Sequence, residues 1–404
     1  MLVAAMSCSG FLSLAAWLCV VAVPLGAAGA SPAEEPSRAR KQADASHAYP
    51  LWDGHETVAQ YAHRVNLPET QTLDLGGGVS LELVLIPAGK FIMGTTEPTV
   101  LDQVPFKQQV IVGQAVLAAG GGILLVLVCS AILGAIRRRR RFQYSLRRFV
   151  AMAFAASLCV LGGMHWWYSA KALAQAQAEH KAALARYQSS YDWEKPAHQV
   201  TLMIPFYLDK YEVTQEQYMQ VMGTNPSHFK GANLPVEQVS WGDAQEFCSK
   251  ANSVQQSSGL LQPQSGGLRH TIRLPTEAEW EFACRAGTTT AYYSGDGDAD
   301  LARIAWNSGK STHPVGQKEP HAWGLYDMHG NLYEWCLDWY GEEYEPGAAT
   351  DPRGPATGTY RVLRGGCSYG VPGEWRSANR AAGGQDGGGW GIGFRVVMLA
   401  PGTP

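Results

Sequence analysis

The chain has 404 residues, a formal net charge of −3, 45 glycines and 13 tryptophans. This length suggests two or three structural units, and the nearly balanced charge excludes a protein that binds nucleic acid through an overall basic surface. Most of the glycine and tryptophan lies after residue 190. This composition indicates a loop-rich domain with large aromatic anchors, and argues against a helical bundle or a plain α/β sheet.

Residues 1–30 are predicted to be a signal peptide. An apolar core spans residues 11–23, and the small residues 28–30 form a cleavage signal before Ser31. No Lys or Arg precedes the core, so an uncleaved N-terminal anchor is the alternative. Both alternatives place the rest of the chain outside the cytoplasm at this point. Residues 31–50 are polar and predict a disordered linker.

The first part of a folded domain is predicted over residues 51–97. The stretch LELVLIPAGKFIMG, residues 81–94, alternates apolar and polar side chains around a Pro-Ala-Gly turn, which indicates two strands. A linker follows at 98–109. The main part of the domain, residues 191–404, begins with another strand-like stretch, PAHQVTLMIPFYLDKYEVT.

Two transmembrane helices are predicted between these parts, at 110–136 and 149–168, because each is long enough to span a bilayer and neither contains a charged residue. The loop between them, 137–148, is rich in arginine, which favours the cytoplasmic side. Residues 169–190 contain no Gly or Pro and predict a helical stalk. The resulting hairpin returns the chain to its starting side.

Two alternatives for this region are weaker. A pair of buried soluble helices would need polar faces, which neither segment has, and a run of like charges does not belong between core helices. A nucleic-acid patch or nuclear signal is the other alternative for Arg137–Arg141, but a short Lys/Arg-rich loop between two spans is typical of a cytoplasmic loop. The sequence therefore predicts a multi-pass protein of the cell membrane, with its main domain on the periplasmic or extracellular side.

Three helix starts are predicted in the main part, each from a capping box or a close variant of one. The cap and its partner three residues on are Thr214 with Gln217, Ser240 with Asp243, and Thr276 with Glu279. Gly223 and Gly287 stand where C-cap glycines would end the first and third helices.

An acidic turn at residues 327–334 is the best candidate for a metal site. Asp327 and Glu334, with Asn331 between them, surround Gly330, and hard oxygen ligands suit calcium. A solvated turn capped by Asp and Asn is the alternative. The stretch at 296–300 begins like an EF-hand but lacks the required Gly and Glu, so it predicts a surface turn.

Five motifs, in this order, resemble the formylglycine-generating enzymes, also called sulfatase-modifying factors. They are VEQVSWGDAQEFC, IRLPTEAEWEFACRAGT, HPVGQKEPHAWGLYDMHGNLYEWCLDWY, YRVLRGGCSY and GIGFRV. The resemblance covers residues 74–94 and 196–398 and implies an α+β, C-type-lectin-like fold with little regular secondary structure. In that family an F-x-M-G strand leads straight to P-x-H-x-V. Here the predicted hairpin separates the two, so it occupies a surface loop of the fold, where insertions cost little.

The resemblance also implies an activity, which this sequence puts in doubt. The family's enzyme oxidises a cysteine of a sulfatase to formylglycine with oxygen and a copper(I) ion held by two thiolates, and thiolates select copper(I). The corresponding segment, residues 365–375, has one cysteine, Cys367, and lacks the motif's histidine. Since one thiolate cannot form a dithiolate site, copper is not expected and no residue is assigned a catalytic role.

The resemblance carries three further site expectations. Calcium would be bound through Asp327, Gly330, Leu332 and Glu334. A ligand groove would form in the C-terminal loops, with Trp375, Arg376, Arg380 and Trp390 as candidate contacts. Four extracytoplasmic cysteines allow two disulfides, for which the pairs Cys248–Cys284 and Cys336–Cys367 are the hypothesis and free buried thiols the alternative.

These observations favour a membrane-anchored extracytoplasmic recognition protein, binding a peptide or protein partner on a scaffold that presents irregular loops. One alternative is an enzyme, either a divergent sulfatase-modifying oxidase or a protein that uses the same groove for another reaction. Another is a diversified C-type-lectin-like ligand-binding protein.

Overall fold

The computed structural model describes residues 49–95, 191–257, 271–370 except 308 and 310, and 373–400, with separate positions between 164 and 182. The predicted signal peptide, both linkers, the basic loop and nearly all of the predicted spans lie outside the described residues. The described positions between 164 and 182 are helical. In the described part of the chain, no helix combines the length and the apolar character needed to cross a membrane.

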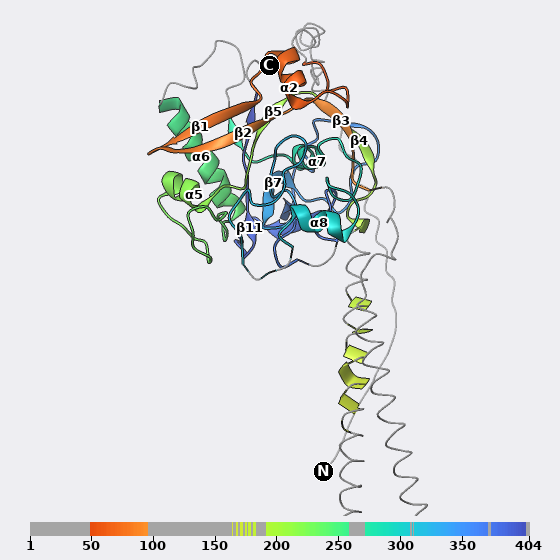
Figure 1. Cartoon of the computed structure of the whole chain (residues 1–404). Coiled ribbons are helices and arrows are strands. Elements are labelled where there is room, and N and C mark those ends of the chain that lie inside the picture. The colour runs from red at the N-terminus through yellow and green to blue at the C-terminus, as the bar shows by residue number, and fades with distance from the viewer. Residues whose placement is uncertain are drawn as a thin grey trace, which may run out of the picture. The chain divides into compact units, whose positions relative to one another are not determined.

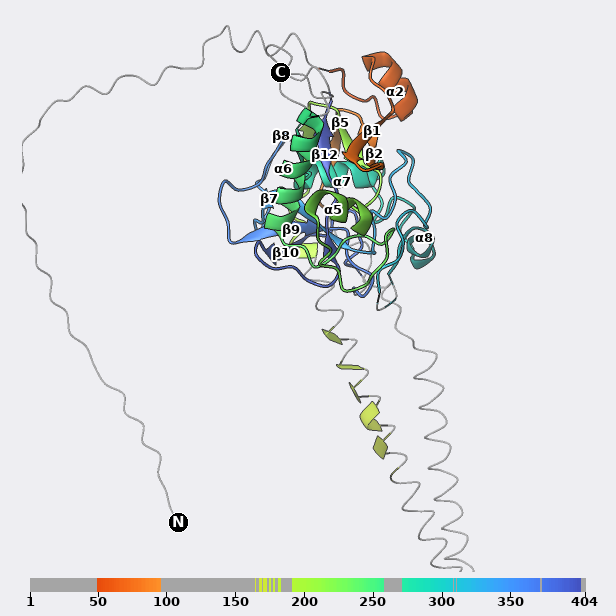
Figure 2. The same cartoon turned by 90° about the vertical axis from the view of Figure 1, so that its left-hand side faces the viewer.

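Short strands and helices alternate with long loops, so the predicted α+β class with little regular structure is confirmed (Figures 1 and 2). The helices are α2 (Val58–Val65), α5 (Gln215–Met222), α6 (Trp241–Ser257), α7 (Glu277–Arg285) and α8 (Asp298–Ile304). The strands are β1 (Thr70–Gly76), β2 (Val79–Ile86), β3 (Gly89–Met93), β4 (His198–Leu202), β5 (Phe206–Asp209), β6 (Ile272–Arg273), β7 (Tyr333–Trp339), β8 (Ala349–Thr350), β9 (Tyr360–Arg364), β10 (Ala381–Gly384), β11 (Ile392–Gly393) and β12 (Val397–Leu399).

The described strands form three sheets. Their orders are β1-β2-β5-β12-β6, β10-β9-β7-β11 and β3-β4-β8. The C-terminal strand β12 lies between β5 and β6 and pairs antiparallel with both. One of the last described segments of the chain thus joins β5 and β6 within the largest sheet.

β3 and β4 are neighbours in space, although residues 96–190 separate them in the sequence. They pair antiparallel, with Phe91 opposite Val200 and Met93 opposite His198. Thr95 N–H donates to the carbonyl oxygen of Glu194 at 3.1 Å. β2 also pairs with β5. The segments before and after residues 96–190 therefore build common sheets, and Thr95 and Glu194, on the two flanks of the intervening segment, are neighbours.

The core is built on both faces of the largest sheet. Leu81, Leu83 and Leu85 of β2 point into a cluster that includes buried residues of α6, whereas Val84 and Ile86 point into a cluster that includes buried residues of α7. Alternate side chains of a strand face opposite ways, so β2 is covered on both sides. This double burial explains the nearly continuous apolar sequence of β2.

The three predicted helix starts are confirmed. Thr214 and Thr276 each form a complete capping box, and Ser240 and Asp243 exchange hydrogen bonds at the start of α6. Gly223 ends α5 as predicted, in the left-handed conformation.

Two local predictions need correction. The C-cap of α7 is Ala286 at φ 45°, and Gly287 follows it at φ 88°. A Cβ on Gly287 would lie 2.6 Å from the Trp52 ring, so glycine is needed there for close packing. The expected surface turn at 296–300 instead leads into α8, because the Asp300 carboxylate accepts the Gly297 N–H at 3.2 Å and caps a helix.

Candidate functional site

The acidic turn is tightly folded and its side chains are buried. Asp327 and Asn331 adopt positive φ angles of 55° and 57°. A Cβ on Gly330 would lie 2.5 Å from the Trp306 carbonyl oxygen, so only glycine fits. The Asn331 side chain donates to the buried Glu212 carboxylate at 2.7 Å, and the Leu332 N–H donates to the same carboxylate at 3.0 Å. The turn is therefore held from inside the protein and is not a solvated turn.

The two predicted calcium carboxylates lie in different environments. Asp327 Oδ2 accepts the Gly316 N–H at 2.7 Å, while Oδ1 is buried and has no partner among the described residues. Burial raises the pKa of Asp327 to about 6. Both oxygens of Glu334 accept hydrogen bonds from Arg395 at 2.7 Å, and Trp280 donates to Oε2 at 2.7 Å. Asp327 thus has a free oxygen, whereas Glu334 already neutralises a guanidinium.

The donor set fits a calcium ion only in part. An unpartnered, buried carboxylate oxygen at Asp327 suits a hard cation. Glu334 does not suit one, because Arg395 already supplies the positive charge. Among the described residues, no group of three or more His, Cys, Asp or Glu side chains could hold a metal ion. A calcium site here would therefore depend on Asp327 and backbone carbonyls, with Glu334 as a buried ion-pair partner.

The predicted disulfides do not form. Cys248, Cys284, Cys336 and Cys367 are all free and buried. Cys248 lies in the core cluster beside α6, while Cys284 and Cys336 lie in the cluster on the other face of the sheet, so the sheet separates the first predicted pair. Burial raises the pKa of Cys248 and of Cys284 to about 12 and that of Cys367 to about 11. These thiols are poor nucleophiles at neutral pH.

Three of the four predicted groove residues are buried, which corrects the predicted groove. Trp375 is 4% exposed and packs in a small cluster with residues of α8. Arg376 and Arg380 are 4% and 2% exposed, and each forms an ion pair, with Glu194 and Glu277 respectively. Buried guanidinium groups need carboxylate partners, and nothing in the local sequence identified those partners. Trp390 is 60% exposed and remains available to a ligand.

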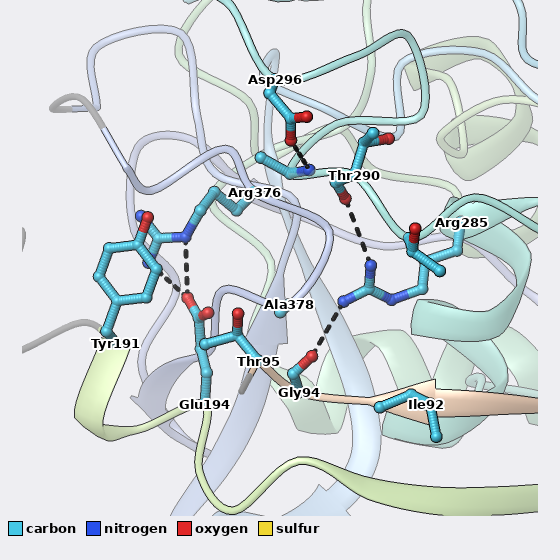
Figure 3. Close-up of a pocket in the computed structure, with 12 residues that line it drawn as sticks. Ile92, Gly94, Thr95, Tyr191, Glu194, Arg285, Thr290, Asp296, Arg376 and Ala378 are labelled. Atoms are coloured by element: carbon cyan, nitrogen blue, oxygen red, sulfur yellow. Dashed lines mark hydrogen bonds and ion pairs between the residues drawn. The ribbon is translucent and has the colours of Figure 1, made fainter. Parts of the chain in front are cut away.

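Arg376 nevertheless lines a cavity of about 380 Å³, beside the residues that flank the segment 96–190 (Figure 3). Its Nε donates to Glu194 at 3.1 Å, and its Cζ lies 3.8 Å from the centre of the Tyr191 ring. Across the cavity, Arg285 donates to the carbonyl oxygens of Thr290 at 3.3 Å and Gly94 at 3.2 Å. The wall combines apolar and polar groups, and its arginines are held by groups of the protein itself.

Exposed aromatic side chains of two C-terminal loops meet one from the loop after α5, and we call these residues, His228, Tyr369 and Trp390, the aromatic loop face. The rings of His228 and Trp390 stack with centroids 4.6 Å apart. Tyr369 is 46% exposed, and a Cβ on Gly391, next to Trp390, would lie 2.4 Å from its hydroxyl. Exposed, stacked aromatic rings are typical of recognition surfaces, because they offer large contact area at a low entropic cost.

Backbone contacts fix this face. The buried Glu237 accepts N–H donors from His228 and Phe229 and so orders the loop that carries His228. A Cβ on Gly388 would lie 2.6 Å from the Gln238 carbonyl oxygen, so the loop before Trp390 packs directly on the backbone before α6. The face is therefore rigidly supported.

Sequence reasoning identified only Trp390 of this face. His228 lies far from Trp390 in the sequence, and no local pattern links them. Tyr369 lies within residues 365–375, where the sequence draws the comparison to a cysteine and gives no sign of an exposed ring. A signal that could have found it is the aromatic residue two positions after Cys367, in a Gly-rich loop with no apolar periodicity.

Comparison with known proteins places this geometry in a family. Residues 160–400, more than half of the chain, match the sulfatase-modifying factor enzyme 1-like domain. The chaperone protein LppX of Paenibacillus barcinonensis is 33% identical over 205 residues, which are 40% of this chain and 68% of LppX. The formylglycine-generating enzyme of Streptomyces coelicolor is 34% identical over 184 residues, 41% of this chain and 52% of that enzyme.

Another relative shares a smaller part of its length. The serine/threonine-protein kinase pkn1 of Chlamydia caviae is 33% identical over 210 residues, which are 46% of this chain and 32% of the kinase. The chain thus spans about half of the Streptomyces enzyme and about a third of the kinase. These proteins carry different names, so the shared domain does not by itself define one activity.

Solved structures show the fold. Treponema denticola variable protein 1 is 23% identical with a TM-score of 0.52, covering 82% of this chain and 99% of that protein. PvdO from Pseudomonas aeruginosa is 20% identical with a TM-score of 0.50 and the same coverage. Both support the expected C-type-lectin-like arrangement. Together with the match over residues 160–400, these findings show that the chain belongs to the sulfatase-modifying factor enzyme 1-like domain family.

Proposed function

We propose that the protein is a membrane-anchored, extracytoplasmic recognition protein that binds a peptide or protein partner through the aromatic loop face, and that it is not a formylglycine-generating oxidase. One observation carries this proposal. Trp390 and Tyr369 are exposed on the C-terminal loops, while Cys367, the one cysteine of residues 365–375, is 3% exposed. The accessible chemistry of these loops is aromatic contact and hydrogen bonding rather than thiolate chemistry.

The protein's own residues support binding without the copper reaction. Copper(I) held by two thiolates needs two accessible, deprotonated cysteines. Burial raises the pKa of Cys367 to about 11, and Trp375 Nε1–H donates to its carbonyl oxygen at 2.9 Å, which fixes the surrounding backbone. The thiol is therefore kept protonated and inside the domain, whereas the rings of the aromatic loop face contact solvent.

The absence of oxidase activity is tested with a Cys-x-Pro-x-Arg peptide. The purified chain is incubated with this peptide, copper(I) and oxygen, and the product is measured by mass spectrometry. We expect the peptide to remain unchanged, and the formylglycine-generating enzyme of Streptomyces coelicolor serves as the positive control. Formylglycine in the product would overturn the proposal and restore the oxidase alternative.

Partner binding is tested by placing a photo-crosslinking amino acid at position 390 in cells that produce the chain. We expect one discrete crosslinked product, which disappears when His228→Ala removes a second ring of the aromatic loop face. Position 219 is the matched control, because Met219 is also exposed, at 44%, but lies on α5. Equal crosslinking at 390 and 219 would contradict a specific surface.

Anchoring by the hairpin 110–168 is part of the same proposal. It is supported by the uncharged stretches in the sequence. Trp167 and Tyr168, at the end of the predicted span 149–168, are helical, and their side chains are 53% and 58% exposed. Exposed aromatic rings at this position are expected at a membrane interface.

We also propose calcium at the acidic turn, with Asp327 as the side-chain ligand and carbonyls of Gly330 and Leu332 completing the site. The unpartnered Oδ1 of Asp327 supports it. A bound calcium ion would stabilise the folded state by mass action. We expect the melting temperature to rise when calcium replaces EDTA, and Asp327→Asn to abolish the rise. No calcium-dependent shift in the wild-type chain would refute the site.

A further inference from the structure

The strand order β3-β4-β8 leaves β3 at the edge of its sheet. The register shows which backbone groups of β3 face outward. Lys90 lies opposite Thr201, and the Thr201 carbonyl accepts the Asp351 N–H on the far side of β4. Lys90 and Thr201 therefore form a non-hydrogen-bonded pair. In such an antiparallel pair, the backbone N–H and C=O groups of the two residues point away from each other. Lys90 therefore points its backbone groups away from β4, and Ile92 does the same by the two-residue period.

Ala88 and Gly94, at the two ends of β3, face the same way as Lys90 and Ile92. Their outward backbone groups already form hydrogen bonds. The Ala88 carbonyl accepts the Trp52 N–H at 2.6 Å. The Gly94 N–H donates to Glu281 at 3.0 Å, and its carbonyl accepts from Arg285. Between these capped ends, the outward backbone groups of Lys90 and Ile92 have no hydrogen-bond partner among the described residues. The edge is closed at both ends and open in the middle.

A groove follows this open edge. A cavity of about 340 Å³ is lined by Lys90, Phe91 and Ile92, together with Trp52 and Phe282. Successive side chains of a strand point to opposite faces, so a cavity that touches all three β3 residues reaches both faces of this edge strand. Gln199 of β4, opposite Ile92, also lines it. Ile92, Arg285 and Thr289 also line the 380 Å³ cavity of Figure 3, which continues the groove.

The chemistry of the groove indicates what would fill it. The lining of the 340 Å³ cavity includes the cations Lys90 and Arg285 and no carboxylate. Arg285 is bound by Glu281, whereas Lys90 is exposed and has no ion pair among the described residues. Phe91, which is partly buried, and the half-exposed Ile92 offer apolar contact. A ligand that complements this groove would therefore offer an unpaired strand backbone, apolar side chains and a negative charge near Lys90.

We propose that the open edge of β3 binds an extended peptide that carries alternating apolar and acidic side chains and pairs with the backbone of Lys90 and Ile92. Strand addition of this kind takes its affinity from main-chain hydrogen bonds and its selectivity from side-chain pockets. This site is separate from the aromatic loop face and does not depend on it.

The test uses the full-length chain in detergent micelles and a defined probe, an acetylated and amidated Val-Glu repeat of six residues. A Val-Lys repeat of the same length is the control. We expect the Val-Glu peptide to bind at least fivefold more tightly and to slow hydrogen exchange at the amides of residues 90 and 92. Lys90→Glu should reverse the preference between the two peptides. Equal affinity for both peptides, or no protection at these amides, would overturn the proposal.

Two matched variants test the backbone contact. Ile92→Pro and Ile92→Ala both shorten the side chain. Proline also removes the outward backbone N–H, whereas alanine keeps it. We expect Ile92→Pro to weaken binding of the Val-Glu peptide about fivefold relative to Ile92→Ala, as for the loss of one hydrogen bond. Equal affinity of the two variants would contradict strand addition. Trp390→Ala should leave the affinity unchanged, and loss of peptide binding in it would move the site to the aromatic loop face.

Discussion

Arg395 shows how much of this domain depends on single buried charges. Its guanidinium is fully buried, binds both oxygens of Glu334, and also donates to the Asp209 carbonyl at 3.0 Å. Removing one member of a buried pair leaves the other charged and without a partner, which costs more than the pair contributes when intact. Arg395 lies between β11 and β12, and its bonds tie this part of the chain to β7 and β5.

Arg395→Leu should lower the free energy of unfolding by about 3–5 kcal/mol, because it leaves Glu334 buried without its counter-ion. The measurement is urea unfolding at neutral pH. Arg303→Leu is the control, since Arg303 pairs with Glu319 on the surface, with 49% and 59% of the side chains exposed, and such pairs stabilise little. Similar losses in both variants would show that burial does not decide the cost.

His329 makes stability depend on pH. Its ring lies 2.6 Å from the Trp375 carbonyl oxygen through Nδ1, which donates, and Tyr293 N–H approaches Nε2 at 3.4 Å. Burial lowers the pKa of His329 to about 3. The unfolded chain takes up a proton near pH 6.5, while the folded chain does not. The stability is therefore complete above pH 6.5 and is lost as the pH falls towards 3.

We expect each such histidine to lower the free energy of unfolding by about 1.4 kcal/mol per pH unit in the range from about pH 6 to pH 4. His321 should contribute in the same way, because burial lowers its pKa to about 3 as well. His329→Gln should make the slope shallower by one proton, measured as unfolding free energy against pH. The same slope in His329→Gln and the wild-type chain would contradict this assignment. His321→Gln is a second variant for the same measurement.

At the scale of elements, the turn after β3 depends on a close backbone contact. Gly94 has a φ of 84°, and a Cβ there would lie 2.2 Å from the Glu194 carbonyl oxygen. That oxygen also accepts the Thr95 N–H, so it cannot move without breaking this hydrogen bond between the segment after β3 and the segment before β4. Gly78, in the β1–β2 turn, has a similar φ of 82° but nothing within 4 Å.

Gly94→Ala and Gly78→Ala therefore separate steric contact from backbone strain. Gly78→Ala should cost about 1 kcal/mol, the strain of a left-handed alanine. Gly94→Ala should cost at least about 3 kcal/mol, because the same strain is joined by a clash with the backbone. Thermal unfolding of both variants gives the comparison. Equal losses would mean that the Gly94 turn rearranges freely.

How far the sequence predicts these elements depends on the range of the interactions. The two residues of each capping pair of α5, α6 and α7 lie three positions apart, so the local sequence predicts these helix starts directly. The burial of Arg376 and Arg380 was not, because it depends on Glu194 and Glu277, each more than a hundred residues away. The exposed partner of Trp390, His228, was missed for the same reason. Local sequence predicts where helices begin, but not which loop residues meet.

For the whole molecule, the proposed membrane hairpin has a direct test. Cysteine substitutions at Ser145 and Ser189 are exposed to a membrane-impermeant thiol reagent in intact cells. We expect Ser189→Cys to react from outside and Ser145→Cys to react only after the membrane is opened. The buried native thiols of the domain give a low background, since burial raises the pKa of Cys248 and Cys284 to about 12. Equal labelling at both sites would rule out the proposed topology.

The hydrogen bond between Thr95 and Glu194 also has a mechanical consequence. A load carried by the two ends of the segment 96–190 enters the domain at one place, on two strands that are already paired. Pulling both ends together puts no tension between β3 and β4, whereas drawing them apart would open their ladder one bond at a time. A force on the two flanks of residues 96–190 would therefore act at one place in the described domain, beside the hydrogen bond between Thr95 and Glu194.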